Sequence, residues 1–138
     1  MRAKCIKNSE LIERTPWKAG GERSEWHFGL TVGRDYTVYG FGLMMGVAVY
    51  LVAAEGSYHP IFVPVSIFDQ PCGSLPPGLH CAVQKTENGI VPSVVFSSIH
   101  FCEDPDFFER LLDNDYETVQ HWNRFKRFVD DWTRNVLS

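Results

Sequence analysis

The chain has 138 residues, 44% of them hydrophobic and 14% aromatic, and its 13 basic and 17 acidic side chains give a formal net charge of -4. This composition can bury a sizeable core, which excludes general disorder and predicts one domain over 1–138. The net acidity argues against a nucleic-acid partner, because sequence-independent binding needs Lys and Arg to neutralise phosphates.

The amino end carries Arg2, Lys4 and Lys7 but no apolar run after them, as a secretory signal would require, so we expect a cytoplasmic protein. The four cysteines, at positions 5, 72, 81 and 102, form no CxxC pair and no dense disulfide framework. We interpret them as buried free thiols.

Strands are predicted over the first three quarters of the chain, about 1–102, where Val, Phe, Tyr, Gly and Pro are frequent. The run Tyr36–Ala54 has no charge, but three glycines and many β-branched or aromatic residues favour two buried strands joined by a Gly40-Phe41-Gly42 turn over a membrane span. Thr15–Trp17 and Gly20–Gly21 prevent a long regular element between the first and second strands. The expected strands are Arg2–Lys7, Asp35–Tyr39, Leu43–Ala53, Ile61–Phe68, Leu79–Lys85 and Ile90–Ile99.

Proline and glycine positions set the rest of this β region. Pro60 and Pro64 make Ile61–Phe68 an edge strand or a bulged strand, because proline donates no ladder hydrogen bond. The segment Gln70–Gly78 must be a loop, and Glu87–Gly89 is a tight hairpin turn.

Two helices are predicted over about 104–136. Asp104 suits the N-cap and Pro105 the first helical position of the shorter one. The longer helix starts at Asn114 or Asp115, and we expect its single apolar stripe to pack on the β region, which favours a monomer over a homodimer. The stripe comprises Trp122, Phe125, Val129, Trp132 and Val136, while His121, Asn123, Arg124, Arg127, Asp130, Asp131 and Arg134 are expected to face solvent. The fold class is therefore α+β: a small antiparallel barrel or curved sheet, SH3-like and partly open, followed by two C-terminal helices.

No spacing of residues identifies an enzyme, a metal site or a cofactor. There is no Gly-x-Ser-x-Gly elbow and no phosphate-binding glycine loop. Cys72, His80, Cys81, His100 and Cys102 could surround zinc only if the fold brought them together, which the sequence leaves open. We predict no metal and no cofactor, and keep a small Cys/His-dependent hydrolase or metal-dependent enzyme as the alternative.

The segment Glu103–Glu117, called the acidic segment below, contains seven carboxylates and one arginine. Helix capping explains Asp104, Asp106 and Asp115 but not all seven, and like charges at this density repel one another. A surface that retains them is suited to a basic partner. The predicted partner-binding residues are Glu103, Asp106, Glu109, Asp113, Asp115 and Glu117.

Four parts of the first half carry a pattern found in a known group of proteins: Ala3–Asn8, Leu30–Gly40, Tyr50–Val52 with Glu55-Gly56, and Pro64 with Ile67–Asp69. Together, over about residues 3–69, they resemble small SH3-like β-barrel modules of bacterial and phage proteins. Such modules have a Leu-Thr-x-Gly-Lys-x-Tyr-x-Val string, in which Arg34 here replaces the lysine. The resemblance implies a half-open barrel and no catalytic residues.

More loosely, a compact β region with an acidic helical appendage is similar to the immunity proteins that neutralise bacterial toxins. We therefore expect a non-enzymatic protein-binding module, an immunity-type or phage-related inhibitor that masks a basic partner, such as a toxin, without contacting nucleic acid or membrane.

Overall fold

A computed structural model of the chain describes residues 1–12, 24–44, 46–55, 59–83 and 93–137, with side chains left undescribed at 9–12 and 24–27. The strands are β1 (Arg2–Lys4), β2 (Ser9–Ile12), β3 (Ser24–His27), β4 (Asp35–Thr37), β5 (Gly40–Met44), β6 (Val47–Ala53), β7 (Pro60–Pro64), β8 (His80–Val83) and β9 (Val94–Ser97). The helices are a 3-10 turn at Val65–Ile67, α1 (Ile99–Glu103), α2 (Phe107–Leu112) and α3 (Tyr116–Leu137).

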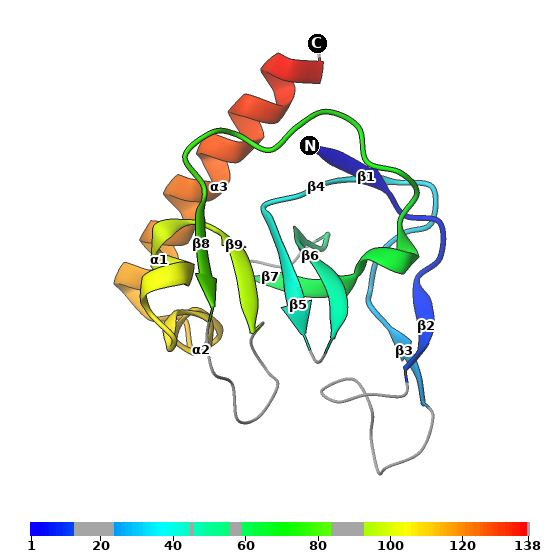
Figure 1. Cartoon of the computed structure of the whole chain (residues 1–138), viewed down its shortest axis with the longest axis horizontal. Coiled ribbons are helices and arrows are strands. Elements are labelled where there is room, and N and C mark those ends of the chain that lie inside the picture. Colours follow the sequence, from blue (N-terminus) through cyan, green and yellow to red (C-terminus); the bar gives the residue numbers. More distant parts are fainter. Residues whose placement is uncertain (13–23, 45, 56–58, 84–92, 138) are drawn as a thin grey trace.

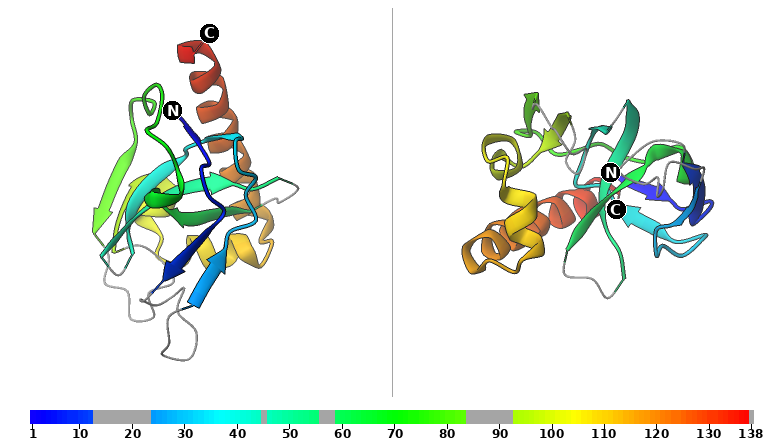
Figure 2. Two further views of the ribbon diagram at one scale, coloured as in Figure 1. Left: turned by 90° about the vertical axis from the view of Figure 1, so that its right-hand side faces the viewer. Right: turned by 90° about the horizontal axis from the view of Figure 1, so that it is seen from below.

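The strands form an open antiparallel arrangement. A five-stranded sheet has the order β7-β6-β5-β9-β8, and two separate ladders join β1 to β4 and β2 to β3. Figures 1 and 2 show the three helices grouped on the side of the molecule away from β2 and β3. The start of the chain, which leads into β1, lies against the carboxyl-terminal end of α3, where the Met1 amine donates a 3.1 Å hydrogen bond to the Thr133 hydroxyl. The α+β prediction of antiparallel strands followed by C-terminal helices is confirmed, and the five-stranded sheet is not closed.

Strand β6 is buried on both faces, which explains why this part of the chain carries no charge. Val49 and Leu51 point into a core shared with the helices, where Trp122 and Leu111 lie. The alternate residues of β6 belong to a second core, with residues of β1 and β4. Side chains alternate across a strand, so a strand covered on both sides must be apolar throughout.

The predicted Gly40-Phe41-Gly42 turn is wrong, because all three residues lie within β5. Gly40 is needed for close approach: a Cβ there would lie 2.4 Å from the Phe96 carbonyl oxygen of the neighbouring strand β9. The turn follows instead at Gly46, whose φ of 79° is the left-handed conformation that glycine adopts readily. Consequently Leu43–Ala53 is not one strand but the end of β5 and all of β6.

The other predicted strands are present but shorter than expected, as β1, β4, β7, β8 and β9, and the ladder of β2 with β3 has no counterpart among the predicted strands. Strand β7 lies at one edge of the sheet, as its two prolines require, although it ends at Pro64 and a 3-10 turn follows. The segment 70–78 contains no strand or helix, and β8 pairs with β9 as an antiparallel ladder. The predicted turn at Glu87–Gly89 and the breakers Thr15–Trp17 and Gly20–Gly21 lie outside the described residues.

The helical part differs from the prediction in the number of helices and in the residues that cap them. The described residues contain three helices after β9, because Ser98 caps an additional short helix, α1, by accepting a hydrogen bond from the Phe101 amide. Helix α2 has its N-cap at Asp106, two residues after the predicted Asp104. Asp104 instead accepts a hydrogen bond of 3.0 Å from the Asp106 amide in the preceding turn.

Helix α3 packs on the sheet as predicted, but its buried face is broader than the expected stripe. Trp122 and Val129 are buried, whereas Val136 near the helix end is exposed. The expectation of a solvent-facing side fails at His121 and Asp130, which are half-buried because each has an aromatic partner, His100 and Tyr39. In the part of the chain that is described, no helix has the length and apolar character needed to cross a membrane.

Candidate functional site

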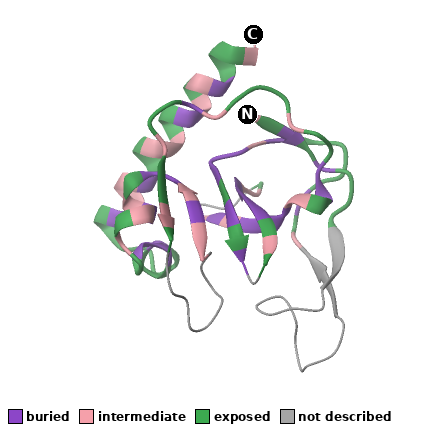
Figure 3. Cartoon of the chain, in the orientation of Figure 1, coloured by how far each residue is buried: buried purple, intermediate pink, exposed green. Residues whose placement is uncertain are grey.

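The acidic segment forms the surface of α1, α2 and the start of α3. All six predicted partner-binding residues are exposed. On α2 and its caps, Asp106, Glu109 and Asp113 follow one another at intervals of three and four, which places them along one side of the helix. Exposed and buried residues alternate along α2 and α3 in Figure 3.

Aromatic packing holds this surface in place from beneath. Phe107, Phe108 and Leu111 of α2 are buried. The Phe107 ring lies 4.7 Å from that of Phe101 in α1, and the Phe108 ring lies 5.4 Å from that of Phe62 in β7. The carboxylates on the opposite side of α2 are therefore carried on a fixed backbone, which lowers the entropy lost on binding.

Two of the seven carboxylates have structural partners. Asp104 pairs with Arg110, the only basic residue of the segment. Asp115 caps α3 by accepting hydrogen bonds from the amide and the hydroxyl of Thr118, at 3.2 and 2.6 Å. These hydrogen bonds hold the pKa of Asp115 below its usual value. Capping thus explains Asp115 but leaves the other five predicted binding residues without an ion pair to any described residue.

Two apolar side chains stand exposed among these acids, which the sequence analysis did not single out. Leu112 at the end of α2 is 45% exposed, and Tyr116 at the start of α3 is 77% exposed. Both could have been found from the sequence, because Leu112 falls beside the acidic side of α2 and Tyr116 stands between Asp115 and Glu117. Exposed aromatic residues are common anchors of protein interfaces.

The cysteines do not share one environment. Cys5 is buried and Cys102 half-buried, whereas Cys72 and Cys81 are exposed, so the prediction of four buried thiols is wrong for these two. Both lie on irregular or edge backbone, where the core does not reach. The Cys102 thiol donates to the carbonyl oxygen of His80, at 3.2 Å. Burial raises the pKa of Cys102, which keeps it protonated and works against a nucleophilic role.

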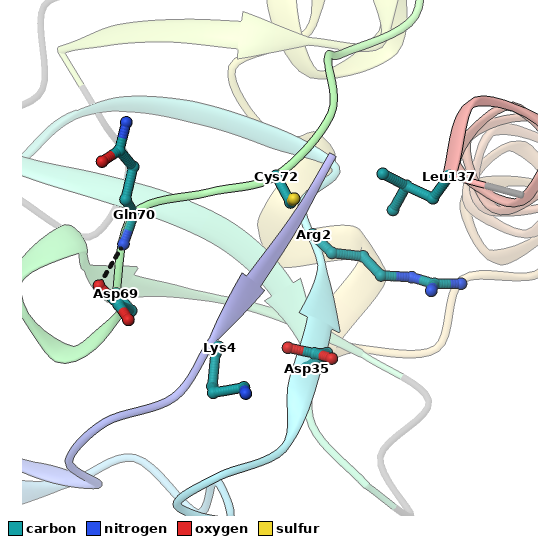
Figure 4. A pocket seen from close by; sticks show the side chains of 7 residues that line it. All are labelled: Arg2, Lys4, Asp35, Asp69, Gln70, Cys72 and Leu137. Carbon is teal, nitrogen blue, oxygen red and sulfur yellow. Dashed lines mark hydrogen bonds between the residues drawn. The ribbon is translucent and has the colours of Figure 1, made fainter.

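The histidines and cysteines considered for zinc do not assemble into a metal site. Among the described residues, no three His, Cys, Asp or Glu side chains are grouped so that they could hold a metal ion. Cys72 lies apart from the others, in a pocket of about 450 Å³ at β1. Figure 4 shows Arg2 and Lys4 on β1, with Asp35 of the paired strand β4 beside them. Asp69 also lines this pocket, so its basic and acidic groups balance.

A second polar cluster joins the connection between β4 and β5 to α3. The Tyr39 hydroxyl donates to Asp130 at 2.5 Å, and Lys126 contacts the same carboxylate at 2.7 Å. Burial and Asp130 raise the pKa of Tyr39 well above its ordinary value, so the phenol stays protonated. These three residues line a pocket of about 360 Å³, in which Arg34 pairs with Glu55 at 3.2 Å. Both cations of this pocket are paired with a carboxylate, so we interpret the cluster as a structural contact between α3 and the strands.

A third pocket, between β8, α1 and α3, brings together His80 and His100, which the sequence analysis considered, and His121, which it placed in solvent. The sequence spacing could have placed His121 correctly, because His121, Phe125 and Phe128 follow one another at intervals of four and three and share one side of α3. Comparisons of the chain with models of known protein families, with curated proteins and with solved structures found no match.

Proposed function

We propose that this chain is a non-enzymatic protein-binding module whose acidic segment covers a basic surface on a partner protein. An immunity-type or phage-related inhibitor that masks a toxin is the form of this function that we favour. The proposal includes a monomer that acts in the cytoplasm, and the four free cysteines, two of them exposed, are in keeping with a reducing compartment.

The observation that carries the proposal is the placement of five exposed carboxylates, none of them in an ion pair with a described residue, on a surface held in place by buried aromatic side chains. Glu103, Asp106, Glu109, Asp113 and Glu117 are exposed and have no ion pair with a described residue. Like charges on one surface repel one another, and a basic partner would relieve this repulsion.

The exposed apolar residues provide the apolar contact surface that a protein interface needs beside its charged groups. Tyr116 and Leu112 supply apolar area that acids alone lack. A well-packed aromatic anchor contributes most to affinity, while a charged rim mainly raises the association rate and excludes wrong partners. This combination favours a folded basic protein over a small cationic ligand.

Reversing three of the acids tests the proposal. The triple variant Glu109→Lys, Asp113→Lys, Glu117→Lys should remain folded, because all three side chains are exposed. Glu109 and Glu117 lie in the first turns of α2 and α3, so each of these two reversals should cost about 0.3 to 1 kcal/mol of stability through the helix dipole. Immobilised wild-type protein should retain a basic partner from a lysate of the native host, and the triple variant should retain at most a tenth as much by quantitative mass spectrometry.

The matched control reverses the same number of charges elsewhere. The variant Asp35→Lys, Asp69→Lys, Asp131→Lys changes three exposed acids outside the acidic segment. It should retain the partner nearly as well as wild type. Equal retention by wild type and the acidic-segment variant would contradict the proposal and redirect attention to the loop Gln70–Gly78.

A further inference from the structure

The pocket between β8, α1 and α3, called the histidine pocket below, has a volume of about 420 Å³. Three histidines from three different elements line it, together with an arginine and a set of apolar side chains. The pocket lining includes His80, His100, His121, Arg124, Ile99 and Phe128. None of the carboxylates on which the proposed function depends lines this pocket.

The titratable and charged residues that line the histidine pocket are all basic. His100 and His121 stack face to face, with ring centroids 3.9 Å apart and an angle of 27° between the planes. Arg124 is exposed and forms no ion pair with a described residue, and no carboxylate lines the pocket. The pockets at β1 and β4 differ in this respect, because each contains acids that balance its cations.

The remaining wall of the pocket is apolar and accessible. Phe128 is 50% exposed and Ile99 is 37% exposed, although both are large hydrophobic residues. An exposed apolar wall beside an uncompensated guanidinium matches a ligand that has both an anionic head and an apolar body.

We propose that the histidine pocket binds a small organic anion, with Arg124 and the histidines contacting its carboxylate or phosphate head and Ile99 and Phe128 contacting its apolar body. The ligand is a small molecule and not a metal ion, since these histidines do not form a metal-holding group. The site therefore adds a ligand-binding activity to a chain whose proposed partner is a basic protein.

Proton uptake should accompany binding. The titratable and charged groups around His100 are His121 and Arg124 on α3, His80 on β8, and Glu103 on its own helix. Burial and the neighbouring His121 hold the pKa of His100 below its usual value, while Glu103 acts in the opposite direction. An anion between the rings and Arg124 would favour the protonated imidazoles, so affinity should rise as the pH falls.

Phenyl phosphate is a suitable probe, because it combines an anionic head with an aromatic body. Titrated into the full-length chain and followed by NMR of the histidine rings, it should shift the resonances of His80, His100 and His121 in a saturable way. The affinity should be several-fold higher at about pH 6 than at about pH 8. Arg124→Gln should weaken binding about ten-fold, the loss expected for one charge-assisted hydrogen bond.

Two comparisons make this test decisive. Arg127→Gln removes an exposed arginine from the same helix that does not line the pocket, and it should bind like wild type. Inorganic phosphate should bind more weakly than phenyl phosphate, because it leaves the apolar wall uncovered. Unshifted histidine resonances, equal losses in the two arginine variants, or equal affinity for the two phosphates would each overturn the proposal.

Discussion

Tyr39 connects the sheet to helix α3 through its hydroxyl. The phenol is buried and donates a 2.5 Å hydrogen bond to Asp130, whose carboxylate also contacts Lys126. The ring packs against Trp122, with centroids 5.3 Å apart. Removing only the hydroxyl therefore isolates the hydrogen bond from the packing.

We expect Tyr39→Phe to lower the free energy of unfolding by about 1.5 kcal/mol, the low end for a hydrogen bond to a charged group, because Asp130 keeps Lys126 as a partner. Urea denaturation of wild type and variant measures the change. Tyr116→Phe is the control, since that hydroxyl is exposed and its loss should leave the midpoint unchanged. Equal midpoints for all three proteins would show that the hydrogen bond from Tyr39 to Asp130 contributes nothing to stability.

His100 gives the stability of the chain a pH dependence. Its pKa is lowered from 6.5, first by burial and then by His121, so the unfolded chain binds the proton more readily than the folded chain does. Stability contributed by this group is therefore complete above about pH 6.5 and is lost as the pH falls below it.

The denaturant midpoint should accordingly fall between about pH 7.5 and pH 5.5, and His100→Phe should make this fall smaller, because a phenyl ring retains the stacking without a titrating nitrogen. Parallel urea titrations of both proteins at the two pH values provide the test. A variant whose midpoint falls as much as that of wild type would rule out His100 as the cause.

At the scale of elements, α3 is held unevenly along its length. Trp122 is 1% exposed and contacts Tyr39, Phe101 and Phe125. Trp132 is only half-buried, and its indole donates a 3.2 Å hydrogen bond to the carbonyl oxygen of Ser74. The amino-terminal half of the helix should therefore carry most of the docking energy.

Trp122→Ala should lower the free energy of unfolding by about 3 to 5 kcal/mol, the range for truncating a buried large aromatic side chain. Trp132→Ala should lower it clearly less. Phe128→Ala, on an exposed position of the same helix, is the control and should change stability by about 0.5 kcal/mol or less. Chemical denaturation of the three variants measures this order of stability. If Trp122→Ala lowered the free energy of unfolding no more than Phe128→Ala does, α3 would not pack on the β region through the face that carries Trp122.

The elements that could be predicted from sequence are those with a local physical signal. Asp115 as the cap of α3 and the prolines of β7 each mark a boundary by their own hydrogen bonding. Gly40 could not be interpreted correctly, because a glycine required for close approach between β5 and β9 is indistinguishable in sequence from a turn glycine.

The same distinction applies to the candidate sites. The exposed acids could be predicted because charge density is a property of the sequence itself. The pairing of His100 with His121 could not, since their contact depends on how α1 folds back onto α3.

At the scale of the whole molecule, two surfaces differ in charge. The acidic segment covers α1, α2 and the start of α3, while the histidine pocket, lined by basic groups, lies between α1, α3 and β8. Surface charge acts over a Debye length of about 8 Å at physiological ionic strength, so its effect on association must weaken as salt is added. The central claim is that the acidic segment attracts a basic protein.

Association kinetics with the protein retained from the host lysate test this claim most directly, for wild type and for Glu109→Lys, Asp113→Lys, Glu117→Lys, at low and high salt. The wild-type association rate constant should fall steeply with salt, and the variant should associate at least ten-fold more slowly at low salt, while the dissociation rate constant changes little. A folded variant that associates as fast as wild type, with the same dependence on salt, would contradict the claim.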